Sequence, residues 1–258
     1  MIDEIGITRA IVENATRDLL DNLEVDVAIA GGGPSGMVAS KYLAEEGVKV
    51  ALFERKLSIG GGMWGGGMLF PKIVVQKEAK HILDDFSINY REDGKQCVAS
   101  SIESVCKITA EAMDAGVKIF NAISVEDVII RNNRICGFVI NWSAVEVAKL
   151  HVDPLAIKSG FCIDATGHSL EVCSIVQRKV GKLNTPSGRI EGERSMWSEL
   201  SESLVVENTK EIYPGLFVAG MAANAAFGAP RMGPIFGGML LSGKRAAEII
   251  LEKVKGCD

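Results

Sequence analysis

The spacing of hydrophobic residues alternates along the chain between a helical and a strand-like pattern, and these patterns predict its helices and strands. Residues 3–23 carry apolar side chains at helical spacing, with Ile5, Ile11 and Leu19 on one face, which predicts an amphipathic helix. Residues 25–30 form a short apolar run rich in β-branched side chains, which is typical of a buried parallel strand. After a glycine-rich turn, helical spacing continues to Gly47, and residues 48–53 form a second apolar strand. The pattern therefore predicts a complete βαβ unit behind an N-terminal helix.

Strand and helix patterns continue through the rest of the chain. Helical spacing occurs within residues 76–93 and over 101–115 and 235–254, and strand patterns occupy 117–120, 126–131, 135–141, 161–164 and 216–219. Asn132 and Asn133 tolerate positive φ, so the strands on either side of them should form a hairpin. Residues 142–160 read as strand or irregular loop. Residues 183–210 are polar and aperiodic, which predicts a mobile segment.

This order of elements predicts an α/β protein with a Rossmann-like dinucleotide-binding fold. A β-hairpin inserted near residues 117–141 is typical of the two-dinucleotide-binding-motif flavoprotein architecture. The chain has 258 residues, enough to bury a sizeable core. We therefore expect residues 1–258 to form a single dinucleotide-binding domain that carries the N-terminal helix and the inserted hairpin.

Composition and charge exclude several classes of partner. The net charge of −5 gives no reason to expect nucleic acid or an anionic membrane. The first 24 residues hold six acids, which excludes a secretory signal, and the uncharged stretch 212–230 is interrupted by proline and glycine, which excludes a membrane span. The 6 cysteines are scattered without a CxxC pair, so we expect reduced thiols in a cytoplasmic protein.

The first βαβ unit carries a dinucleotide-binding motif. Gly31 would permit the tight turn after the strand, Gly33 would let the backbone approach a pyrophosphate, and Gly36 would allow close packing of helix and strand. The phosphates would bind the free N–H groups at the helix N-terminus. The alternative is a merely structural glycine turn, but the strand and helix around the motif favour dinucleotide binding.

The end of the second strand bears on which dinucleotide binds. Glu54 is positioned to accept hydrogen bonds from ribose hydroxyls, which favours NAD or FAD over NADP. Arg55 argues against this preference, since an arginine there could instead bind the 2′-phosphate of NADP. Residues 60–67 hold six glycines and are either a flexible loop or backbone that passes close to a ligand.

Two histidines and an aspartate could bind a metal. His151 and Asp153 point to one face if their segment is extended, and His168 follows a predicted strand end, where open α/β sheets bind ligands. Imidazole and carboxylate suit Fe(II), Mn(II) or Zn(II). Spacing alone does not separate such a site from a hydrogen-bonded histidine and an ion-paired aspartate.

Arg231 stands within the otherwise uncharged stretch 212–243. A cation there requires an anion, and its planar guanidinium suits a carboxylate or a phosphate. A bound substrate and a structural ion pair are both compatible with this position.

Several motifs, taken together, resemble the thiamine thiazole synthase family over residues 10–254. They are Ala30-Gly-Gly-Gly-Pro-Ser-Gly36, the glycine run 60–67, Asn121-x-x-Ser-Val-Glu-Asp127, Asn141-Trp142, Asp153-Pro154, Ala165-Thr-Gly-His168, Pro214-Gly-Leu, Gly220-Met221 and Arg231-Met-Gly-Pro-x-Phe-Gly237. Members of that family build the thiazole of thiamine as an ADP adduct, and they consume NAD and glycine rather than transfer hydride.

The resemblance implies a set of roles. Asp153 and His168 correspond to the family's iron ligands, from one subunit or from two, and Arg231 to the group that holds the glycine carboxylate. It also implies a homo-oligomer, an octamer by resemblance. The residues implied around the ADP-ribose part of NAD are Ser35, Glu54, Arg55, Gly62, Val125, Val152 and Met221.

Two departures from related patterns refine this expectation. Eukaryotic members carry a sulfur-donating cysteine two residues before the Asp-Pro, where this chain has His151. The chain therefore resembles the archaeal kind, which uses free sulfide and can turn over repeatedly, and His151 is a candidate for proton relay or for a further metal contact. FAD proteins of this architecture usually carry an acid after the last strand's glycine, where this chain has Met221. The alternatives to thiazole synthesis are an FAD-dependent oxidoreductase of the same fold and a non-catalytic NAD or iron sensor.

Overall fold

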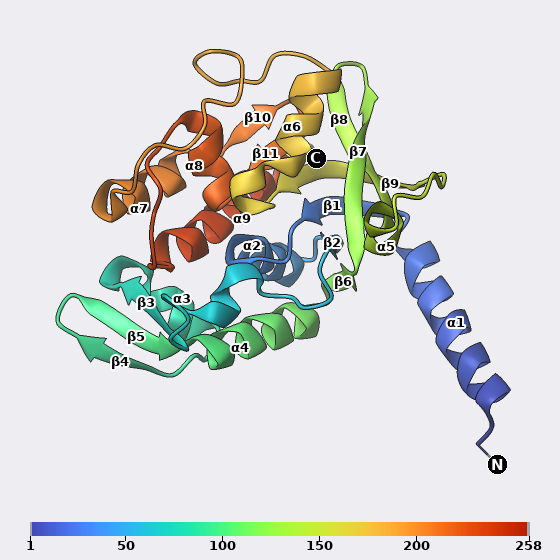
Figure 1. Cartoon of the computed structure of the whole chain (residues 1–258), viewed down its shortest axis with the longest axis horizontal. Helices are drawn as coiled ribbons and strands as arrows, with labels where there is room; N and C mark the ends of the chain where they lie inside the picture. The colour runs from blue at the N-terminus through green and yellow to red at the C-terminus, as the bar shows by residue number, and fades with distance from the viewer. Residues whose placement is uncertain (1, 257–258) are drawn as a thin grey trace.

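The computed structural model describes residues 2–256, which form a mixed α/β fold around one large sheet (Figure 1). Cys257 lies outside these residues. The sheet runs in the order β10-β11-β9-β1-β2-β6, and β8 pairs with both β7 and β9. β1, β2, β6, β9 and β11 are parallel, which confirms the predicted Rossmann-like class. The strands are β1 (Glu24–Ala30), β2 (Val50–Glu54), β6 (Lys118–Asn121), β7 (Ile123–Arg131), β8 (Arg134–Trp142), β9 (Leu155–Asp164), β10 (Glu211–Tyr213) and β11 (Leu216–Val218).

β1 lies at the centre of the core because both of its faces are covered. Val27 and Ile29 pack into a cluster with α2 (Pro34–Glu45), α4 (Ser101–Asp114) and α9 (Gly237–Lys255). Ala28 and Ala30 face the opposite cluster, formed by β8, α6 (Glu171–Lys179) and α8 (Met221–Phe227). Side chains of one strand alternate between the two faces, so its apolar run fills both clusters.

A second, three-stranded sheet corrects the prediction for residues 76–93. β3 (Lys72–Gln76), β5 (Gln96–Ser100) and β4 (Tyr90–Asp93) pair antiparallel beneath the main body (Figure 1). The predicted helix is confined to a 3₁₀ turn (Lys77–Ala79) and α3 (Lys80–Asp85). Each of these strands has four or five residues, so alternation marks few buried positions in it.

The predicted hairpin is confirmed as β7 and β8. Asn132 and Asn133 have φ of 51° and 59°, as the turn requires. The segment after it was left open by the pattern and consists of α5 (Ser143–Val147), an irregular connection, and the first half of β9. β9 begins at Leu155, earlier than the predicted strand, because its first half pairs with β8.

The C-terminal third holds helices that the sequence pattern did not show. α7 (Ser198–Glu207) lies within the stretch expected to be mobile, and α8 lies between the predicted strand 216–219 and the predicted helix 235–254. Residues 191–197 are irregular but tied to the chain around α8 by backbone hydrogen bonds from Glu191, Gly192 and Arg194. The prediction of an aperiodic segment at 183–210 is therefore wrong for residues 198–207, which form α7.

α1 (Glu4–Asp21) is the predicted N-terminal helix. It projects away from the body of the molecule (Figure 1), and none of its side chains is buried. Ile5 and Ile11 are 69% and 64% exposed, whereas Leu19 near the C-terminal end of the helix packs against the core cluster around Ala28. Most of its apolar face therefore does not cover this chain's own sheet. Within residues 2–256, no helix combines the length and apolar character needed to cross a bilayer.

Candidate functional site

A cavity of about 780 Å³ opens at the carboxyl ends of β1, β2 and β9. β1 pairs with β2 on one side and β9 on the other, so the cavity lies at the switch point where open α/β sheets bind ligands. The site residues expected from the sequence that line it are Gly31, Gly33, Ser35, Glu54, Arg55, Gly62, Val125, His168, Met221 and Arg231. Four others, Gly36, His151, Val152 and Asp153, do not line it.

The three motif glycines differ in whether the surrounding chain leaves room for a Cβ atom. Gly31 has φ of 103°, and a Cβ there would meet the carbonyl oxygen of Ala165 at 2.4 Å. A Cβ at Gly36 would meet the carbonyl oxygen of Gly31 at 2.1 Å. At Gly33, nothing in the chain lies within 4 Å of a Cβ position. Chain packing thus requires Gly31 and Gly36, whereas Gly33 faces open space that a ligand would fill.

The N-terminus of α2 points into this space. Gly33 is its N-cap residue and provides no side-chain hydrogen bond, and Pro34 occupies the first turn. The first N–H groups of such a helix lack carbonyl partners within it and bind anions readily. Ser35 is 5% exposed and lies against Gly220, the residue before α8.

Glu54 is held rigidly at the end of β2. Its Oε2 accepts the N–H of Gly32 at 2.8 Å, and its Oε1 accepts the N–H of Lys56 at 2.8 Å. Each carboxylate oxygen can accept a further hydrogen bond. The buried carboxylate therefore links β2 to the glycine turn and keeps acceptor capacity for ribose hydroxyls.

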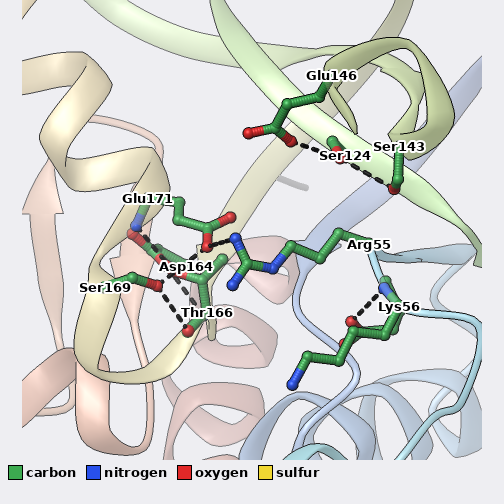
Figure 2. Close-up of polar contacts among 10 residues, drawn as sticks. Arg55, Lys56, Ser124, Ser143, Glu146, Asp164, Thr166, Ser169 and Glu171 are labelled. Carbon is green, nitrogen blue, oxygen red and sulfur yellow. Dashed lines mark hydrogen bonds and ion pairs between the residues drawn. The ribbon is translucent and has the colours of Figure 1, made fainter. Parts of the chain in front are cut away.

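An ion pair crosses the cavity between the ends of β2 and β9. Figure 2 shows the Arg55 guanidinium directed at Glu171, with Nη1 to Oε1 at 2.6 Å. Glu171 is the first residue of α6, and its N–H donates to the Thr166 hydroxyl at 2.9 Å. Burial raises the pKa of the Glu171 carboxyl above its ordinary value, while Arg55 and the Ser169 hydroxyl oppose that rise.

Asp164 fixes the turn that carries Glu171 and His168. It is fully buried at the end of β9. Its Oδ1 accepts the N–H and hydroxyl of Thr166, and its Oδ2 accepts the N–H of Cys173 at 2.8 Å. One carboxylate thus ties the strand end both to the turn and to the first turn of α6.

His168 lies on the cavity wall with one ring nitrogen already engaged. Its Nδ1 is 2.6 Å from Oε1 of Glu193. A carboxylate accepts, so Nδ1 donates to Glu193 and Nε2 is the ring nitrogen that this contact leaves unengaged. Carboxylates bonded in this way orient metal-binding histidines in proteins.

Arg231 lines the same cavity. Its N–H donates to the Arg194 carbonyl at 3.0 Å, and its own carbonyl accepts the Trp197 N–H at 3.1 Å. Glu193 belongs to this same segment, so residues 191–197 connect His168 to the backbone of Arg231. Arg231 is exposed, and no ion pair with an acid holds its guanidinium among residues 2–256. Solvent therefore reaches this charge, and the structural ion pair considered from the sequence is not formed.

His151 and Asp153 lie in the exposed connection between α5 and β9, away from the cavity of their own chain. Among residues 2–256, no three His, Cys, Asp or Glu side chains group closely enough to hold a metal. Imidazole from His168 and the exposed Asp153 carboxylate remain suitable donor types for Fe(II). Because Asp153 does not line the cavity that holds His168, the structure does not bring this donor pair together within residues 2–256.

Sequence reasoning missed Glu193, Glu171, Asp164 and Lys56, all of which contact or line the site. Asp164 could have been found, because an acid at the end of an apolar strand is unusual within a core. Glu193 lies 25 residues from His168 in the chain, in a stretch without periodicity, so no local signal marks it.

Known proteins resemble the chain over almost its full length. A family described as the Thi4 family matches residues 8–236. The thiamine thiazole synthase of Methanothermobacter thermautotrophicus is 60% identical over 256 residues, which cover 98% of this chain and 99% of that protein. Those of Desulfosudis oleivorans and Pyrococcus abyssi are 59% and 57% identical, with 98% of this chain and 99% of each relative covered.

Solved structures agree with these relatives. The crystal structure of Thermovibrio ammonificans THI4 superposes with a TM-score of 0.95 at 48% identity, covering 98% of this chain and 99% of that one. A geranylgeranyl bacteriochlorophyll reductase-like protein of Thermoplasma acidophilum shares the fold, with a TM-score of 0.58 at 16% identity and coverage of 91% and 80%. By sequence and by structure, the chain belongs to the Thi4 family of thiamine thiazole synthases.

Proposed function

We propose that the chain makes the thiazole of thiamine as ADP-thiazole carboxylate from NAD, glycine and free sulfide, with Fe(II), over multiple turnovers. The observation that carries this proposal is one cavity that combines a dinucleotide-binding glycine turn with His168 and Arg231. Relatives that are 60% and 57% identical over almost the whole chain are thiamine thiazole synthases, which supports thiazole synthesis over hydride transfer.

The ADP part of NAD would lie along the β1–α2 turn. Its pyrophosphate would accept the free N–H groups of α2 above Gly33, and Glu54 would accept the ribose hydroxyls. Gly62, Val125 and Met221 line the same cavity and would contact the ADP-ribose part, as the family resemblance implies.

The second half of the cavity would hold the reacting groups. Arg231 would bind the glycine carboxylate through its planar guanidinium, oriented by the backbone bonds to residues 194 and 197. After loss of nicotinamide, the ADP-ribose would present a carbonyl to the glycine amine, and the glycine turn and Arg231 would hold the two together. His151, in place of a sulfur-donating cysteine, favours sulfide as the sulfur source.

His168 and the Asp153 of a second copy would hold Fe(II). When bound, the metal would supply a Lewis acid and a template for the incoming sulfide. Glu193 would fix the ring of His168 so that Nε2 points away from its own segment. The exposed apolar face of α1 and the exposed Leu150 and Val152 beside Asp153 support a homo-oligomer.

Anaerobic incubation with NAD, glycine, sulfide and Fe(II), followed by mass spectrometry, tests the proposal. An adenylated thiazole should form in molar excess over the chain, and should be absent when any one of the four is omitted. Product without added sulfide would contradict the sulfur source. A yellow protein with bound FAD and no thiazole would instead support an oxidoreductase.

A further inference from the structure

The arginine after Glu54 leaves open which dinucleotide the cavity accepts. In proteins of this fold, an acid at the end of the second strand selects NAD, whereas an arginine nearby accommodates a 2′-phosphate. Glu54 and Arg55 place both signals next to each other. What decides between them is whether the guanidinium is free to meet a phosphate.

The Arg55 guanidinium is not free. It is bound to Glu171 at 2.6 Å and is about half exposed, so the pair itself adds little stability. Glu171 cannot follow Arg55 toward a ligand, because α6 and the Thr166 hydroxyl hold its backbone. Even if Arg55 turned away, the Glu54 and Glu171 carboxylates would remain on the cavity wall.

From this arrangement we infer that Glu171 is a specificity-determining residue that makes the cavity reject 2′-phosphorylated dinucleotides. The inference rests on the proposed function, because it assumes that the adenosine ribose lies beside Glu54. A 2′-phosphate there would face two carboxylates and an arginine that is already neutralised. Like charges placed together suppress binding of the wrong partner. Lys56 lines the same cavity and no ion pair among residues 2–256 holds its ammonium, so its charge offsets part of this repulsion.

ADP-ribose and 2′-phospho-ADP-ribose test the inference, because they differ in one phosphate and need no chemistry to bind. Affinities are measured by titration calorimetry without metal, glycine or sulfide. The unmodified chain should bind ADP-ribose more tightly, by about tenfold or more. Glu171→Gln should tighten binding of 2′-phospho-ADP-ribose by about tenfold and leave ADP-ribose within about twofold.

Three further variants identify the cause. Glu146→Gln removes one negative charge near the same wall, where Glu146 contacts Ser124 rather than Arg55 (Figure 2), and should change the affinity for 2′-phospho-ADP-ribose by much less than Glu171→Gln does. Glu171→Asp keeps the charge and should keep the rejection. Adding Arg55→Ala to Glu171→Gln should abolish the gain. If Glu171→Gln does not fold, Arg55→Ala alone should weaken binding of 2′-phospho-ADP-ribose further, since the Glu171 carboxylate then loses its ion-pair partner.

The binding measurements distinguish failure of the inference about Glu171 from failure of the proposed function. Equal binding of both compounds by the unmodified chain, or no gain in Glu171→Gln, would overturn the inference and leave the proposed function intact. If Arg55→Ala is the variant that folds, an unchanged affinity for 2′-phospho-ADP-ribose would overturn it in the same way. Failure of the unmodified chain to bind either compound would overturn both.

Discussion

The Glu193 carboxylate accepts the Nδ1 proton of His168 at 2.6 Å, across 25 residues of chain. Removal of a carboxylate that orients a metal-binding histidine typically weakens metal binding by about 10–100-fold. We expect Glu193→Ala to weaken Co(II) or Fe(II) binding to this extent while ADP-ribose binding persists. Titration calorimetry measures both. Glu199→Ala, an exposed acid in the first turn of α7, is the matched control. Unchanged metal affinity in Glu193→Ala would show that His168 needs no such support.

Asp153 and His168 should complement each other between chains. Asp153→Ala and His168→Ala are each expected to abolish iron-dependent thiazole formation. If the metal is shared between copies, a mixed oligomer of the two variants contains some sites with both native ligands. Random association of equal amounts should restore about a quarter of the sites. Turnover is measured after joint refolding or co-expression. No recovery in oligomers proven to be mixed would place both ligands in one chain, contrary to the exposed position of Asp153.

Gly33 and Gly36 should respond differently to the same substitution. Gly36→Ala places a methyl group 2.1 Å from the Gly31 carbonyl oxygen, so we expect a loss of about 1–3 kcal/mol in the free energy of unfolding. Gly33→Ala meets no atom of the chain within 4 Å, so stability should change little. Its methyl group would occupy the expected pyrophosphate position, and ADP-ribose binding should fall by about tenfold or more. Denaturant unfolding and ligand titration of both variants test this contrast.

Glu202 should make stability depend on pH near neutrality. Its Oε2 accepts the N–H of Gly238 at 2.7 Å, while its Oε1 is buried without a partner. Burial raises the pKa of this carboxyl from 4.5 to about 7, against the opposing effects of Gly238 and Gln76. The folded chain thus holds the proton more tightly than the unfolded chain. Its contribution is present below pH 4.5 and is lost as pH rises through about 7.

The partial exposure of Glu202 limits this effect to ~2 kcal/mol between about pH 5 and about pH 8. Glu202→Gln carries no proton to lose and should flatten this part of the profile. Denaturant unfolding of both forms across this range provides the measurement. An equally steep profile in Glu202→Gln would assign the pH dependence to other groups.

Apolar periodicity and turn-forming residues were the most informative parts of the sequence. They predict the βαβ unit, the Asn132-Asn133 turn and the strand ending at Asp164. The cavity lies at the ends of those strands. Contacts between distant segments carry no local pattern, so Glu193 and Glu171 could not be assigned. The short strands β3 and β4 were missed because they gain stability from pairing rather than from a pattern of their own.

α1 spans 18 residues and buries none of its side chains. Isolated helices of this length are marginal in water, because most helical stability in proteins comes from packing. The helix content of α1 should therefore depend on the protein concentration. In the proposed homo-oligomer, other copies would cover α1. Dilution to the concentration at which such copies separate should then cause a loss of helix from residues 4–21 by circular dichroism, while the sheet remains native.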